Sequence, residues 1–177
     1  MKQLPNILTL SRMALLPVLI WFLYIPENWA MWSALGLYAF SAITDFLDGY
    51  IARKMNFVSP FGTFLDPIAD KVFVAVILIA LVDIGRLDGL WTIPVIIIFT
   101  REFLVSGMRE FLGPKNIKLP VTQLAKWKTT FQMIALGILI YGGDALMGGQ
   151  LTLAIAAVLT IITGWNYLKV GLKHLTD

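Results

Sequence analysis

Residues 45–70 read DFLDGYIARKMNFVSPFGTFLDPIAD, and this stretch decides the fold. It holds four carboxylates, at Asp45, Asp48, Asp66 and Asp70, although the sequence on both sides is largely apolar. An aspartate at the centre of a bilayer costs roughly 2.5–3.5 kcal/mol on insertion scales, so acids at membrane depth mark functional sites. We therefore interpret the stretch as an active site carried by two membrane-spanning helices.

The spacing of the acidic and small residues places them on two helix faces. At about 100° per residue, one face of the first helix holds Asp45, Asp48, Gly49 and Ala52. On the second helix, Asp66 and Asp70 are four residues apart and share a face, with Gly62 one turn earlier. Residues 54–60 are too few for anything except a tight antiparallel connection, so we expect the two acidic faces to oppose each other.

Carboxylates brought this close would repel one another unless cations bind between them. Oxygen ligands alone favour hard cations such as Mg²⁺ or Mn²⁺, and four carboxylates can hold two ions about 4 Å apart. The small residues at 49, 52 and 62 leave room beside the acids for a substrate, and Arg53 offers a positive charge suited to a phosphate. The alternatives are a cytoplasmic loop, or buried salt bridges to neighbouring lysines, Lys54 and Lys71.

The pattern D-x2-D-G-x2-A-R-x8-G-x3-D-x3-D, from Asp45 to Asp70, resembles the signature of the CDP-alcohol phosphatidyltransferase family at all eight fixed positions. The resemblance implies a CDP-activated diacylglycerol as donor, a small alcohol as acceptor, and a homodimer. It implies that the four aspartates hold the metal ions and that Asp70 is also the general base. The residues implied to bind the donor are Asp48, Gly49, Ala52, Arg53 and Gly62.

Composition agrees with a membrane protein. Of the 177 residues, 58% are hydrophobic and only 14% are charged, whereas soluble domains carry about 25% charged residues. Cysteine is absent, which excludes thiol catalysis, disulfides and thiolate metal sites. Neither of the glycine-rich nucleotide-binding motifs, G-x-x-x-x-G-K-[ST] and G-x-G-x-x-G, occurs. We expect a single transmembrane catalytic domain over residues 1–177, and no nucleic-acid partner.

Apolar runs separated by polar turns predict an all-α integral membrane protein with six spans, at residues 6–24, 30–55, 61–84, 90–111, 120–141 and 148–172. Asn6 is expected to cap the first helix. Among the lysines and arginines near the helix ends, only Arg86 lies opposite the side that carries both termini. The positive-inside rule therefore places both termini and the acidic stretch on the cytoplasmic side, for which a bacterial inner membrane is the simplest setting.

A second polar cluster is expected where the fourth helix meets the fifth. Arg101 and Arg109 lie about 80° apart around the fourth helix, and Lys126 and Lys128 follow at the start of the fifth. Arginines at membrane depth need a partner, and a phosphate is a natural one. The alternatives are that Lys126, Lys128 and Arg109 reach the lipid headgroups, or that acids on the same helix neutralise the arginines, namely Glu102 and Glu110.

Two segments around these cations, R-E-F-x2-S-G-x-R at 101–109 and L-A-K-W-K-T at 124–129, resemble bacterial phosphatidylglycerophosphate synthases, a branch of the same family. This resemblance implies transfer of the phosphatidyl group from CDP-diacylglycerol to glycerol 3-phosphate, with release of CMP, in phosphatidylglycerol and cardiolipin synthesis. It also implies that Arg101, Arg109, Lys126 and Lys128 hold the acceptor. Other acceptors stay open: inositol phosphate, phosphatidylglycerol, serine and choline.

Near the N-terminus, Asn6, Thr9 and Arg12 share one helix face. This polar stripe reaches either the lipid headgroups or the acidic site. The pattern P-N-x2-T-x2-R is similar to the N-terminus of the same synthases, which implies that Asn6 and Thr9 bind CDP-diacylglycerol. A function of another class, a divalent-cation transporter, is also considered because acids within a membrane mark ion pathways.

Overall fold

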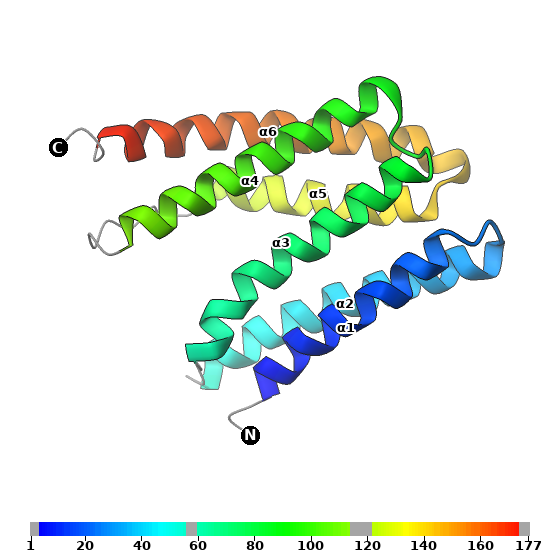
Figure 1. Ribbon diagram of the computed structural model, residues 1–177, viewed down its shortest axis with the longest axis horizontal. Coiled ribbons are helices and arrows are strands. Elements are labelled where there is room, and N and C mark those ends of the chain that lie inside the picture. The colour runs from blue at the N-terminus through cyan, green and yellow to red at the C-terminus, as the bar shows by residue number, and fades with distance from the viewer. Residues whose placement is uncertain (1–3, 56–59, 114–121, 174–177) are drawn as a thin grey trace. The chain divides into compact units, whose positions relative to one another are not determined.

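The computed structural model describes residues 4–55, 60–113 and 122–173 (Figure 1). Within these ranges, the side chains at positions 4–9, 46–55, 60, 61, 63, 170, 172 and 173 lie outside the description. The described chain consists of helices and turns throughout, so the all-α prediction is confirmed.

Six α-helices make up most of the described chain: α1 Leu4–Leu23, α2 Asn28–Met55, α3 Pro60–Asp83, α4 Thr92–Leu112, α5 Gln123–Tyr141 and α6 Leu146–Lys173. Two short 3-10 turns precede α4 and α6, η1 Gly89–Trp91 and η2 Gly143–Ala145. Each helix corresponds to one of the six apolar runs in the sequence. The pattern of apolar runs and turns therefore located every helix within the described residues.

Every α-helix starts within three residues of its predicted position, and the starts of α1 and α5 bear on how these helices are capped. Helix α1 begins at Leu4, so Asn6 lies inside its first turn and its prediction as the cap was wrong. Pro5 fits there because the first N–H groups of a helix have no intrahelical partner. Helix α5 begins only at Gln123, because Thr122 is extended and its hydroxyl accepts a hydrogen bond from the Ala125 N–H at 3.2 Å.

Helix α3 ends in a hydrogen-bonded glycine turn. The Arg86 N–H donates to the Leu81 carbonyl at 2.9 Å, and the Gly85 N–H donates to the Val82 carbonyl at 3.0 Å. This pair of bonds satisfies carbonyls that the helix end leaves without partners, and it requires a left-handed residue. Gly85 has a φ of 77°, which a glycine adopts without strain. The predicted polar turn after the third helix is thus present.

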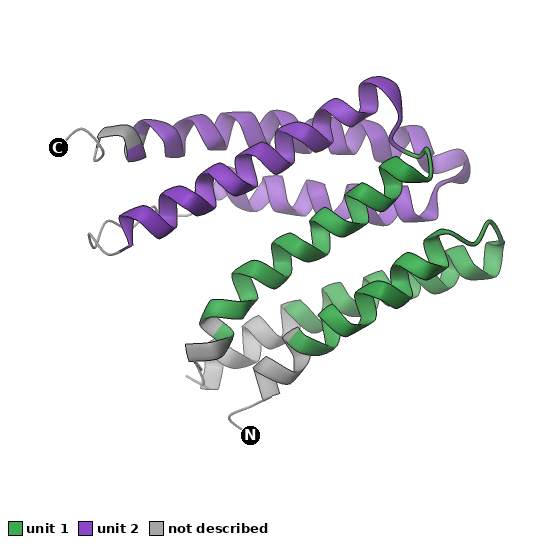
Figure 2. Ribbon diagram, in the orientation of Figure 1, with its two compact units in different colours: residues 1–86 green, residues 87–177 purple. Residues whose placement is uncertain are grey.

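The chain forms two compact units, residues 1–86 and residues 87–177 (Figure 2). In the first unit, α1 packs against both α2 and α3, and the buried contacts include Leu19, Ala34 and Leu78. In the second unit, α6 packs against both α4 and α5, around Leu136, Leu153 and further apolar residues. Each unit is therefore a three-helix arrangement with its own apolar core.

Two helical segments in the described residues, 89–112 and 143–169, are long and apolar enough to cross a membrane. Only 22% and 33% of their most apolar windows are buried, whereas the core helix of a soluble protein would be mostly buried. Large apolar side chains are exposed on both, for example Phe103 and Trp165. Exposed large apolar side chains on long apolar helices suit a lipid environment.

Candidate active site

Arg12 of α1 lies at the centre of a charged cluster in the first unit. Its guanidinium donates a hydrogen bond to the carboxylate of Asp45 on α2, and its Nη1 donates to Oδ1 of Asp70 on α3 at 2.6 Å. The Arg12 side chain is only 6% exposed, while those of Asp45 and Asp70 are 49% and 56% exposed. Helix α1 thus brings together one acid from each half of the 45–70 stretch, on a buried cation.

This acidic cluster, defined by Arg12, Asp45 and Asp70, carries more negative than positive charge. One guanidinium neutralises one of the two carboxylates, and the exposed sides of both remain open to a further cation. Carboxylate oxygens are the donors that Mg²⁺ and Mn²⁺ prefer, so the donor chemistry fits the predicted metal. Among the side chains that the structure describes, no three acidic, histidine or cysteine residues are grouped as a metal site.

The predicted donor-site residues fall into two groups. Asp66 is exposed on α3 one turn before Asp70, and Gly62 is buried on the same helix. The remaining predictions concern side chains outside the description: Asp48, Gly49, Ala52, Arg53, Asn6 and Thr9. The sequence left open whether Arg12 reaches the headgroups or the acids, and the structure places it between the acids. The signal for it was its helical spacing from Asn6 and Thr9.

A basic cluster occupies the second unit, defined by Arg101 and Arg109 of α4, Lys128 of α5 and the acid Glu102 of α4. Lys128 Nζ donates to Oε1 of Glu102 at 2.5 Å, and Arg101 Nη1 donates to the same oxygen at 3.0 Å. Lys128 is buried, with 7% of its side chain exposed. Glu102 therefore does pair with Arg101, as the alternative interpretation expected, but a single carboxylate shared by two cations leaves positive charge in excess.

An aromatic ring joins the two arginines of the basic cluster. The guanidinium carbons of Arg101 and Arg109 lie 5.3 Å and 5.6 Å from the ring centroid of Tyr167 on α6. Gly164, one turn earlier on α6, lets the Arg101 stem approach, because a Cβ there would lie only 3.0 Å from Arg101 Cγ. Tyr167 was not predicted as a site residue, since nothing in the sequence of an apolar helix distinguishes a ring that faces cations from one that faces lipid.

Lys126 lies apart from the other three predicted cations. It is exposed, whereas Lys128 is buried. Two residues correspond to about 200° around a helix, so the two lysines of α5 point in nearly opposite directions. Glu110 is also exposed on α4, away from the Glu102 ion pairs. The structure thus brings together three of the four predicted cations.

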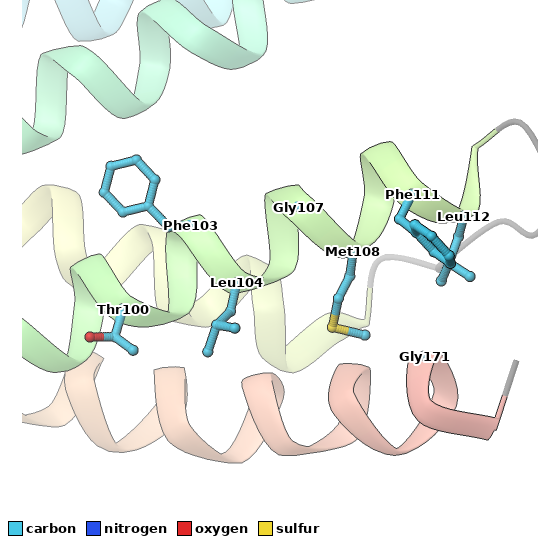
Figure 3. Close-up of a pocket in the computed structure, with 8 residues that line it drawn as sticks. All are labelled: Thr100, Phe103, Leu104, Gly107, Met108, Phe111, Leu112 and Gly171. Atoms are coloured by element: carbon cyan, nitrogen blue, oxygen red, sulfur yellow. The ribbon is translucent and has the colours of Figure 1, made fainter. Parts of the chain in front are cut away.

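An apolar groove of about 580 Å³ lies beside the basic cluster, between α4 and α6. Figure 3 shows Leu104 and Met108 of α4 pointing toward α6, and Phe103 pointing away from it. At Gly171, a Cβ would lie 1.8 Å from the Met108 methyl, so only a glycine at this position leaves room for the Met108 side chain as it lies. The lining residues are Thr100, Phe103, Leu104, Gly107, Met108, Phe111, Leu112 and Gly171. A groove with this lining suits a hydrocarbon chain.

Residues 2–163 match the CDP-alcohol phosphatidyltransferase family, and the chain belongs to this family. It is 47% identical over 175 residues to a CDP-diacylglycerol–glycerol-3-phosphate 3-phosphatidyltransferase of Rickettsia typhi, covering 96% of this chain and 97% of that protein. A protein with the same name from Cereibacter sphaeroides is 40% identical, covering 99% of this chain and 98% of that one. A CMP-forming cardiolipin synthase of Oryza sativa is 41% identical, covering 96% of this chain and 53% of the synthase.

Proposed function

We propose that this protein transfers the phosphatidyl group from CDP-diacylglycerol to glycerol 3-phosphate and releases CMP. The observation that carries the proposal is its similarity, at 40–47% identity and over nearly the whole chain, to relatives named for this reaction. The two clusters support it because they carry opposite excess charge. An acidic site suits metal-assisted binding of a pyrophosphate, and a basic one suits a phosphorylated acceptor.

On the donor side, Asp45, Asp48, Asp66 and Asp70 would hold two Mg²⁺ or Mn²⁺ ions. When bound, these ions supply charge neutralisation at the pyrophosphate during an in-line displacement. The chain's own contribution is to orient the acids, and Arg12 does so for two of them through its hydrogen bonds.

The rest of the donor is proposed to lie along the small residues of the signature. Gly62 is buried, and a larger side chain there would compete with the nucleotide for space. Gly49 and Ala52 would receive the cytidine in the same way, and Asn6, Thr9 and Arg53 would bind its polar groups. The acyl chains would follow apolar grooves such as the one between α4 and α6.

The proposed reaction is one displacement at phosphorus. Asp70 accepts the proton of the acceptor hydroxyl, whose oxygen forms a new bond to the phosphorus attached to diacylglycerol. The bond from that phosphorus to the CMP oxygen breaks, and CMP leaves with the electron pair. The acceptor's own phosphate would be held by the predicted cations, Arg101, Arg109, Lys126 and Lys128. Of these, Lys126 lies apart from the other three.

We also propose that all six helices span the membrane with both termini and the active site toward the cytoplasm, and that the chain works as a homodimer. Support for the orientation comes from the lysines and arginines near the helix ends and from the charged substrates. A bacterial inner membrane fits this topology.

A second candidate acceptor is phosphatidylglycerol, because the rice cardiolipin synthase is 41% identical over nearly all of this chain. Phosphatidylglycerol carries one phosphodiester charge, whereas glycerol 3-phosphate carries up to two charges on a terminal phosphate. The excess positive charge of the basic cluster therefore favours glycerol 3-phosphate.

The test is CMP release by the purified protein in detergent with CDP-diacylglycerol, Mg²⁺ or Mn²⁺, and one acceptor at a time. The acceptors are glycerol 3-phosphate, inositol phosphate, phosphatidylglycerol and serine. Release with glycerol 3-phosphate alone, abolished by a chelator, is the expected result. Release only with another acceptor would overturn the assignment of the acceptor. Folded protein that releases no CMP with any acceptor, and conducts divalent cations in vesicles, would favour a transporter instead.

A further inference from the structure

We propose that Tyr167 is a positioning residue that holds Arg101 and Arg109 in place to bind the phosphate of the acceptor. This inference rests on the proposed function and extends it to a residue outside the family signature. Tyr167 contributes its ring from α6, while both arginines belong to α4. Their guanidinium carbons lie at nearly equal distances from the ring centroid, 5.3 Å and 5.6 Å.

The shared ring helps to hold two like-charged arginines close together in the basic cluster. Arg101 and Arg109 carry like charges, and Glu102 is engaged by Arg101 and Lys128. No ion pair to Arg109 is found among the described side chains, where Glu102 pairs with Arg101 and Lys128. The face of an aromatic ring attracts guanidinium groups without neutralising them, so their N–H donors keep their full charge for a ligand. An additional carboxylate would instead compete with the phosphate.

The ring is itself firmly held. Tyr167 is 4% exposed and packs in an apolar cluster with Val105 and Leu112 of α4, with Met108 beside it. Because α4 supplies both the arginines and the packing partners of the ring, the ring has a fixed place relative to the guanidinium groups. Arg101 is confined further by the close approach of its stem to Gly164.

The ring, and not the hydroxyl, carries this role. The Tyr167 hydroxyl oxygen is buried and has no hydrogen-bond partner among the described residues. A buried hydroxyl without a partner costs stability, so its removal does no harm to the fold. Phenylalanine at this position keeps the ring face and therefore should keep the acceptor site.

The experiment compares Tyr167→Phe and Tyr167→Leu in the full-length protein in detergent. Leucine preserves an apolar packing volume but has no ring, so we expect the KM for glycerol 3-phosphate to rise between about 3-fold and about 30-fold. The KM for CDP-diacylglycerol stays within about twofold of wild type. Tyr167→Phe leaves both values unchanged. Trp165→Leu is the matched control, because Trp165 lies on the same helix with the Lys169 ammonium 5.6 Å from its ring centroid, but is exposed.

Four outcomes would overturn the proposal. An unchanged KM for glycerol 3-phosphate in folded Tyr167→Leu would show that the ring does not position the arginines. Equal rises for both substrates, or an equal rise in Trp165→Leu, would indicate general damage to α6. A rise in Tyr167→Phe as large as in Tyr167→Leu would assign the role to the hydroxyl.

A second readout separates this proposal from the proposed function. If wild-type protein releases no CMP with glycerol 3-phosphate, the proposed function fails, and the anion site is then tested with inorganic phosphate alone. We expect phosphate to raise the thermal unfolding temperature of wild type and Tyr167→Phe, and to have a smaller effect on Tyr167→Leu. The same shift in all three proteins would overturn the role of Tyr167 irrespective of the reaction.

Discussion

The acidic cluster and the basic cluster are built on the same plan with the charges exchanged. In the first, a buried cation, Arg12, bonds to two carboxylates that are about half exposed. In the second, one carboxylate, Glu102, bonds to two cations, of which Lys128 is almost fully buried. Each cluster therefore keeps an excess of one sign, and the central residue prevents its neighbours from repelling one another.

The clusters differ in which member is exposed. The excess charge of the acidic cluster lies on accessible carboxylates, which suits ligands that arrive from water. In the basic cluster the bonds to Glu102 are more deeply buried, and breaking a buried ion pair is costlier because it leaves a charge without a partner. The same plan thus predicts a larger effect on chemistry in the acidic cluster and a larger effect on stability in the basic one.

The largest effect is expected for Asp45→Asn. The amide keeps the size of the side chain but removes a charge needed at the proposed metal site, so CMP release should fall by about a hundredfold to a thousandfold. Folding should change little, because the side chain is 49% exposed and Arg12 keeps its bond to Asp70. The activity assay and thermal unfolding in detergent check both statements. Wild-type turnover in this variant would remove Asp45 from the chemistry.

Glu102→Gln is the corresponding change in the basic cluster, and it should act mainly on stability. It leaves the buried Lys128 without its anionic partner, which should cost about 3 kcal/mol in free energy of unfolding. Denaturant unfolding in mixed micelles measures the loss. Glu110→Gln is the control, since Glu110 is exposed on the same helix and its substitution should cost less than about 0.5 kcal/mol. Equal losses of unfolding free energy in Glu102→Gln and Glu110→Gln would contradict the expectation that the basic cluster contributes mainly to stability.

The sequence was sufficient for the helices because long apolar runs and polar turns are local signals. It also located the acids, since charges in an apolar chain stand out. The hydrogen-bond partners of individual side chains were harder to predict from the sequence. The bond from Arg12 to both Asp45 and Asp70 depends on how α1 packs between two other helices, and the 3.6-residue period gives only the face on which a side chain lies.

Lys126 and Lys128 show the same limit of sequence-based prediction, here for two residues that were expected to act together. The resemblance of the segment at 124–129 to the synthases implies that Lys126 and Lys128 both hold the acceptor. The helical period alone separates them by about 200°, and burial then selects Lys128. Tyr167 could not have been found in this way, since its role depends on two arginines of another helix.

Replacing each lysine by methionine sharpens this distinction. Lys128→Met removes a buried charge while it keeps the apolar stem, so the KM for glycerol 3-phosphate should rise about tenfold, the value of one charge-assisted hydrogen bond. The loss of stability should be smaller than for Glu102→Gln, because Glu102 keeps Arg101 as a partner. Lys126→Met should leave the KM within about twofold of wild type. A larger effect at Lys126 would place the acceptor on the exposed face of α5.

Among the changes made within the two clusters, the smallest effect is expected for Arg12→Lys, which keeps the central charge of the acidic cluster and changes only its geometry. A guanidinium donates in two directions from one rigid plane, and the Arg12 bonds to Asp45 and Asp70 use this property. An ammonium on a flexible stem holds one carboxylate well and the other poorly, so one hydrogen bond worth about 0.5–1.5 kcal/mol is weakened. We expect kcat to fall about threefold, and to fall further in Arg12→Gln, where the charge is also lost. If Arg12→Lys and Arg12→Gln lowered kcat equally, the two-directional geometry of the guanidinium would matter and its charge would not. If lysine were fully active, charge alone would organise the acids, and the two clusters would then follow the same electrostatic rule without any demand on geometry.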